Sequence, residues 1–86
     1  MKVLIPSPLL SYTAGNKDVE ANGSTLSDVL ADLEQQFPGI RFRIVDEQEH
    51  MRPHMRFFIN GEQTFDLKQP LCATDSLQIV QALSGG

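Results

Sequence analysis

The residues with the clearest potential for chemistry are the last two, Gly85 and Gly86, which follow an apolar segment typical of a β-strand. Glycine adds no side chain and costs the most backbone entropy to order. A glycine pair therefore suits a tail that threads a narrow enzyme channel, where the Gly86 carboxylate would meet a nucleotide phosphate. A frayed terminus is the alternative, and the two glycines alone do not decide between these interpretations.

Three further residues have side chains that could take part in chemistry, but each is more simply explained by a structural role. Cys72 has no adjacent basic residue to favour the reactive thiolate, so we expect it to act as a small apolar residue that packs near the last turn. His50 and His54 have the spacing of metal ligands, with Glu47 and Glu49 near them. No Cys or further His completes a site, so we expect a solvated loop and no metal. Because no catalytic constellation is present, we do not expect an enzyme.

Composition limits the classes of protein and partner. The 86 residues allow one small domain, and the net charge of −4 argues against nucleic acid as a partner. The acidic balance suits docking onto a basic surface of a protein. No apolar run is long enough for a membrane span, and Pro6 interrupts the short apolar start, so no signal peptide is expected. With a single cysteine, the expected location is cytoplasmic.

The first half of the chain predicts a hairpin followed by one helix. Residues 2–5 alternate like a strand that ends at Pro6, and residues 17–21 form its partner. Thr25 is the expected N-cap of the helix, with Asp28 in the place of a capping-box acid. One apolar stripe follows at helical spacing before Pro38 and Gly39, namely Leu26, Val29, Leu30, Leu33 and Phe37.

The second half predicts further strands. Residues 40–45 suit either a short helix or a strand, and residues 46–54 read as an exposed loop. Residues 56–59 are strand formers. Asn60 and Gly61 then predict a tight type I′ hairpin turn, with residues 62–65 as the return arm. A crossing segment leads to a last strand that begins near Leu77.

One amphipathic helix between β-segments predicts an α+β fold, in which a mixed sheet of four to five strands packs on that helix. We expect the first and last strands to be parallel neighbours at the centre. This arrangement is a ubiquitin-like β-grasp. The expected domain covers residues 1–83, and residues 84–86 form a flexible reactive tail.

The sheet face away from the helix is the predicted docking surface. Leu77 and Ile79 should face the helix, which turns their alternating neighbours outward. An open apolar face beside a reactive tail is a natural place for a partner to hold the body. The predicted docking residues are Leu4, Phe58, Gln78, Val80, Ala82, Leu83 and Ser84.

Motifs spread over the whole chain resemble the MoaD and ThiS family of ubiquitin-like sulfur-carrier proteins. The helix motif alone is weak, but a strand, an Asn-Gly turn, an Asp-Ser-Leu turn and a terminal Gly-Gly in one short chain are specific. The segments that carry the resemblance are residues 1–5, residues 25–30, Leu33, Phe37-Pro38-Gly39, Phe58-Ile59-Asn60-Gly61-Glu62, Asp75-Ser76-Leu77 and Ala82-Leu83-Ser84-Gly85-Gly86.

The resemblance implies a carrier without a catalytic site or bound cofactor of its own. An adenylating enzyme of the MoeB or ThiF type would use ATP and Mg²⁺ to activate the Gly86 carboxylate. Sulfur would then replace AMP to give a thiocarboxylate, from which a partner synthase would take the sulfur. The recipient is open among molybdopterin, thiamine, and cysteine or homocysteine pathways. The alternative function is a ubiquitin-like modifier joined through Gly86 to lysines of other proteins.

Overall fold

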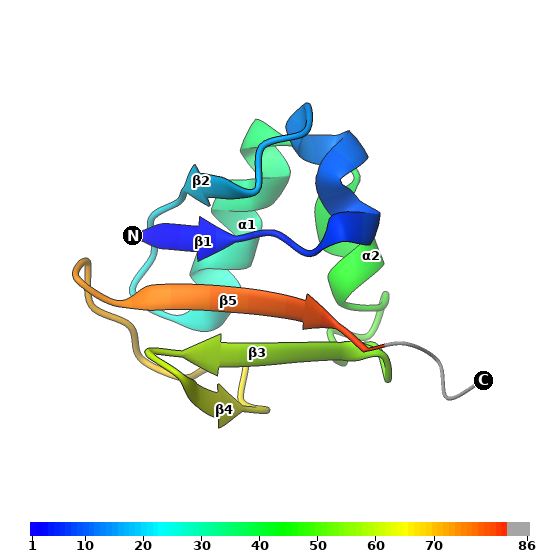
Figure 1. Cartoon of the computed structure of the whole chain (residues 1–86). Coiled ribbons are helices and arrows are strands. Elements are labelled where there is room, and N and C mark those ends of the chain that lie inside the picture. The colour runs from blue at the N-terminus through cyan, green and yellow to red at the C-terminus, as the bar shows by residue number, and fades with distance from the viewer. Residues whose placement is uncertain (83–86) are drawn as a thin grey trace.

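The computed structural model describes residues 1–82 and consists of a five-stranded mixed sheet with helices packed on one face (Figure 1). Helix α1 crosses behind the strands, and the described chain reaches its last residues beyond the arrowhead of β5. The elements in chain order are β1 (Lys2–Leu4), the 3₁₀ helix η1 (Ser7–Thr13), β2 (Asp18–Glu20), α1 (Leu26–Gln36), α2 (Ile40–Ile44), β3 (Met55–Ile59), β4 (Glu62–Thr64) and β5 (Ser76–Gln81).

The sheet has the strand order β2-β1-β5-β3-β4. Strand β1 pairs with β5 in parallel and with β2 antiparallel, while β3 pairs antiparallel with both β5 and β4. The predicted parallel pair at the centre is therefore confirmed, as is the α+β β-grasp fold. The first half of β5, as far as Gln78, therefore has a hydrogen-bonded neighbour on each side, and its second half, as far as Gln81, is held by β3.

Helix α1 begins where the sequence predicts. The Thr25 hydroxyl oxygen accepts a hydrogen bond from the Asp28 backbone N–H at 3.2 Å. Asp28 completes no reciprocal bond of the capping-box type; its carboxylate accepts from the Ser24 hydroxyl at 3.0 Å. The predicted stripe faces the core, since Leu26 and Leu33 are fully buried.

The undecided segment after α1 is a short helix. Ile40 and Ile44 of α2 lie four residues apart and are both fully buried, which is the helical pattern and places Arg41 and Arg43 at the surface. The Glu34 carboxylate holds the entry to α2 by accepting from the backbone N–H of Gly39 at 2.8 Å and of Arg41 at 3.0 Å. These two bonds lower the pKa of Glu34.

The β3–β4 turn is tied to the start of β5. Asn60 and Gly61 have φ values of 52° and 87°, as the predicted type I′ turn requires. The Asn60 side chain donates to Asp75 at 2.9 Å and accepts from the Ser76 N–H at 3.0 Å. Asp75 also accepts from the Cys72 backbone N–H at 2.8 Å. This backbone bond, and after it the bond from the Asn60 side chain, lower the pKa of Asp75.

The core lies between the sheet and the helices and includes Phe57, Leu77 and Ile79, which are at most 2% exposed. The prediction that Leu77 and Ile79 face the helix side is therefore confirmed. The interpretation of Cys72 as a packed apolar residue is wrong, because Cys72 is exposed. Leu71, one position earlier, is the residue of this turn that enters the core.

Candidate partner-docking site

The predicted docking residues form a continuous area on the outer face of the sheet. The strand registers place Leu4 beside Gln78 and Gln78 beside Phe58, which makes one row across β1, β5 and β3. Val80 lies two residues further along β5, opposite Arg56. Gln78 is exposed, and the other three predicted residues are half-buried. The face thus offers aliphatic and aromatic surface with one amide at its centre.

The end of β5 is anchored to the strand beside it. Gln81 pairs with Met55 in the β3–β5 ladder. The Ala82 backbone N–H then donates to the His54 carbonyl oxygen at 2.6 Å. This bond lies outside the regular ladder and holds the last described residue against the loop before β3. It sets the position from which the chain continues.

The remaining predicted site residues lie outside the described residues. They are Leu83, Ser84, Gly85 and Gly86. The expected boundary between a domain of residues 1–83 and a tail of residues 84–86 also lies outside the described residues, so it is not tested. The roles given to these residues stay predictions.

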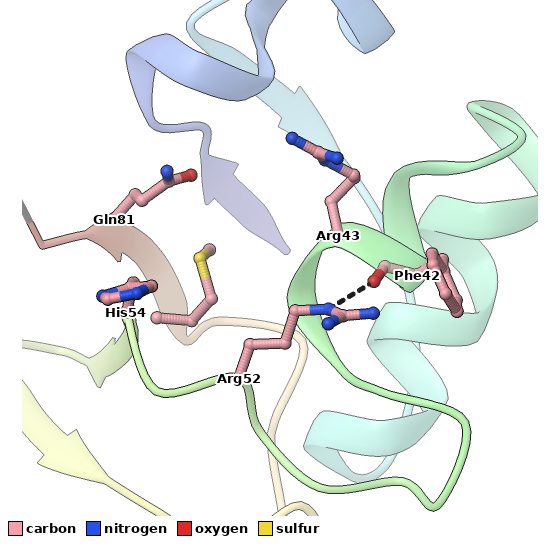
Figure 2. A pocket seen from close by; sticks show the side chains of 6 residues that line it. Phe42, Arg43, Arg52, His54 and Gln81 are labelled. Carbon is pink, nitrogen blue, oxygen red and sulfur yellow. Dashed lines mark hydrogen bonds between the residues drawn. The ribbon is translucent and has the colours of Figure 1, made fainter. Parts of the chain in front are cut away.

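A shallow pocket of about 270 Å³ lies beside the end of β5 (Figure 2). Side chains from three parts of the chain surround it: Arg43 on α2, Arg52 and His54 in the following loop, and Gln81 on β5. The other lining residues are Phe42 and the buried Met55. Among residues 1–82 no carboxylate lines the pocket, so Arg43 and Arg52 give this surface a positive charge in an acidic protein.

Sequence reasoning missed this pocket. It treated His54 as part of a solvated loop and left residues 40–45 undecided, so Arg43 could not be placed. A signal was present, because four of the seven Lys and Arg residues lie in the segment 41–56, namely Arg41, Arg43, Arg52 and Arg56. Only Arg43 and Arg52 of these four line the pocket, and their meeting depends on α2 and on the path of the loop, which no local pattern specifies.

The loop between α2 and β3 is organised by Asp46. Its carboxylate accepts from the backbone N–H groups of His50 at 2.8 Å and Gln48 at 2.9 Å, and these bonds lower the pKa of Asp46. His50 Nδ1 lies 3.8 Å from an Asp46 carboxylate oxygen, and His50 is not part of the pocket lining. In the part of the chain that the structure describes, no three His, Cys, Asp or Glu side chains are grouped as a metal site would require.

Comparison with known proteins decides the family. The sequence model of the ThiS family matches residues 3–86. The chain belongs to the ThiS family. A curated relative is the sulfur carrier protein CysO of Mycobacterium tuberculosis, which is 34% identical over 89 residues that cover 98% of this chain and 96% of the relative. CysO of Mycobacterium bovis matches with the same values.

Solved structures of similar proteins share the whole fold with this ThiS-family chain. A chain of the Amycolatopsis orientalis BexX/CysO complex superposes with a TM-score of 0.90 at 33% identity and covers 99% of this chain and 98% of its own length. Mycobacterium tuberculosis CysO gives 0.89 at 31% identity, with 95% and 98% covered. SAMP1 from Haloferax volcanii gives 0.79 at 26% identity, with 100% and 98% covered.

Among residues 1–82 of this ThiS-family chain, no helix is long and apolar enough to span a membrane.

Proposed function

We propose that this chain is a sulfur carrier that works through a thiocarboxylate at Gly86. The observation that carries the proposal is its likeness to proteins named sulfur carrier protein CysO, at 34% identity over 98% of the chain. A second support is the docking face of Leu4, Phe58, Gln78 and Val80, which extends over β1, β5 and β3 and so includes the last described strand before Gly86. A partner that holds this face receives the end of the chain.

The proposed chemistry has two steps, both in the active site of an activating enzyme. In the first, an oxygen of the Gly86 carboxylate attacks the α-phosphorus of ATP, and pyrophosphate leaves. In the second, a sulfur nucleophile attacks the acyl carbon, and AMP leaves with the bonding electron pair. Adenylation is needed because a carboxylate has only oxide as a leaving group. Mg²⁺ and cationic residues of the enzyme stabilise the phosphate charge.

The partners of this proposal are an adenylating enzyme of the MoeB or ThiF type and a synthase that accepts the sulfur. A structure of a complex between BexX and CysO of Amycolatopsis orientalis supports the expectation that a carrier of this kind binds a protein partner. The likeness to CysO favours a recipient in sulfur metabolism over molybdopterin. Catalysis then belongs to the partners, and this chain supplies the acyl group.

The test is the intact mass of the chain after incubation with an adenylating enzyme, ATP, Mg²⁺ and a sulfide source. Replacement of one carboxylate oxygen by sulfur adds about 16 Da, and omission of ATP is the control. A chain from which Gly86 is deleted should show no shift. A ThiS-family relative in the same tube shows that the enzyme is active. If the relative gains sulfur and the mass of the full chain stays unchanged, the proposal is refuted.

The alternative of a protein modifier has one supporting observation, the 26% identity to SAMP1, a small archaeal modifier protein. The CysO proteins are more similar in both sequence and structure, so sulfur transfer is the favoured function. Gly-Gly remnants on lysines of cellular proteins, found after proteolysis, would favour conjugation.

A further inference from the structure

The basic pocket at the end of β5 is not used by the docking face or by the chemistry at Gly86. Arg43, Arg52 and His54 line it, together with the Gln81 side chain (Figure 2). The protein as a whole carries 11 acidic residues against seven Lys and Arg. A pocket that is lined by two arginines, and by no carboxylate of residues 1–82, therefore attracts an anionic group.

Arg52 is held in a fixed orientation at this pocket. Its Nε–H donates to the Phe42 carbonyl oxygen at 2.7 Å, and its guanidinium carbon lies 4.6 Å from the centre of the Phe42 ring. These contacts leave the terminal nitrogens of the guanidinium without an acceptor among residues 1–82. A guanidinium that is oriented in advance loses less entropy when it binds a carboxylate.

Arg43 differs from the arginines near it in having no partner among residues 1–82. Arg41 forms an ion pair with Glu49 at 3.0 Å, and Arg56 donates to the Pro53 and Met55 carbonyl oxygens. Arg43 is exposed, and no hydrogen bond or ion pair of its side chain is found in that part of the chain. It is thus available to a ligand.

The position of the pocket indicates what kind of ligand it takes. Gln81 is both the last residue of β5 and part of the pocket wall. The Ala82 N–H bond to the His54 carbonyl oxygen holds the chain beside the pocket as it leaves the sheet. A protein that contacts the chain at Gln81 and Ala82 lies next to the pocket, and its carboxylate side chains can pair with the two guanidinium groups there.

We infer that this pocket binds an acidic segment of the protein partner that takes up the end of the chain. The inference rests on the proposed function for the identity of that partner. It adds a second, charged contact area to the apolar docking face, at the point where the tail leaves the body. One Asp or Glu side chain fits a pocket of about 270 Å³, with Arg43 and Arg52 as donors and Met55 as its apolar base.

The first arm of the test measures binding of the full chain to its adenylating enzyme by calorimetry at two salt concentrations. Arg43→Glu should weaken binding about tenfold or more and reduce its salt dependence, because a favourable charge pair becomes a repulsion. Lys68→Glu is the matched control, since it makes the same charge change in the crossing segment between β4 and β5. Arg43→Lys should retain most of the affinity.

The second arm needs no partner enzyme. In NMR titrations of the wild type, a hexaglutamate peptide should shift the Gln81 side-chain amide and the Arg52 Nε–H signals, and the Arg43→Glu variant should lose these shifts. Equal shifts with inorganic phosphate at the same charge concentration would show a small-anion site and overturn the inference. Unchanged signals with the peptide, or unchanged enzyme affinity of Arg43→Glu, would also overturn it.

The outcomes separate this inference from the proposed function. If Arg43→Glu binds normally and still gains sulfur, the pocket has no role in docking while the carrier function stands. If the wild type binds hexaglutamate at the pocket but gains no sulfur, the anion site stands and the carrier function fails.

Discussion

At the scale of the residue, the docking face depends on a few partly exposed side chains at fixed register positions. Leu4, Gln78 and Phe58 lie in one row, and Val80 lies next to it on β5. Alternation along the first and last strands was enough to predict Leu4, Gln78 and Val80 on this face, because Leu77 and Ile79 identify the buried side of β5, but it left Phe57 and Phe58 as alternatives. The basic pocket could not be predicted in this way, since Arg43 and Arg52 meet only through the fold of α2 and the loop.

A negative charge on the docking face should weaken partner binding. Val80→Asp places a carboxylate on a half-buried, apolar position of β5, so we expect affinity for the adenylating enzyme to fall at least tenfold. Calorimetric titration gives the affinity. Ala31→Asp is the control, since it adds the same charge on the exposed side of α1. Equal affinities of the two variants would contradict the assignment of this face.

Asp75 should support the fold in a pH-dependent way. Its folded pKa lies below the ordinary value of 3.8, so its contribution is present above that value and is lost as pH falls through the folded pKa. Asp75→Ala removes the acceptor for the Cys72 N–H and for Asn60. Urea unfolding should show a less stable variant at pH 7, with the difference from wild type shrinking towards about pH 2. A constant difference across this range would argue against the ionised carboxylate as the cause.

At the scale of the element, β5 connects the parts of the proposed function. It pairs with β1 and β3, carries two of the predicted docking residues, and ends at the basic pocket. Its start is fixed by the bonds of Asn60 and Asp75, and its end by the Ala82–His54 bond. Both ends are thus fixed independently of any partner. The direction in which the chain leaves the sheet is a property of the folded body.

The approach to α1 should be sensitive to one added methyl group. A Cβ at Gly23 would lie 2.6 Å from the Val29 backbone nitrogen and 2.7 Å from the Asp28 Cβ, so the chain must shift. Gly23→Ala should lower stability by about 2 kcal/mol, which corresponds to a Tm lower by roughly 10 °C. Differential scanning calorimetry measures this change.

Gly61→Ala is the comparison for this steric effect. No atom lies within 4 Å of a Cβ at Gly61, and only the positive φ of 87° opposes the methyl group. We expect a smaller loss of about 1 kcal/mol. If Gly23→Ala were as stable as the wild type, the close approach of the chain to α1 would not restrict that position.

At the scale of the whole molecule, the sequence predicts the β-grasp because each strong local signal agrees with the global fold. The Thr25 cap, the buried stripe of α1 and the Asn60-Gly61 turn lie where the patterns place them. The sequence leaves the outcome open where packing decides it. Of residues 40–45, which suited a helix or a strand, Ile40–Ile44 are helical because Ile40 and Ile44 both enter the core. The 3₁₀ helix η1 covers the core edge through Leu9.

The exposed position of Cys72 makes it the competing site for sulfur. Its thiolate can attack a sulfane sulfur of polysulfide in the sulfide solution, which forms a persulfide and releases the shorter polysulfide. Cys72→Ser should therefore leave sulfur loading unchanged if the sulfur resides at Gly86. The side chain of Cys72 makes no hydrogen bond within residues 1–82, so the substitution should not disturb the fold.

The most direct test of the central claim is the intact mass and fragment spectrum of the Cys72→Ser variant and the wild type. Both are measured after incubation with the adenylating enzyme, ATP, Mg²⁺ and a sulfide solution that also contains polysulfide. The sulfur-carrier account predicts a gain of about 16 Da that fragmentation places at Gly86, whereas a persulfide on Cys72 of the wild type would add about 32 Da. A wild type that gains sulfur only as about 32 Da, together with a Cys72→Ser variant that gains none, would contradict the account.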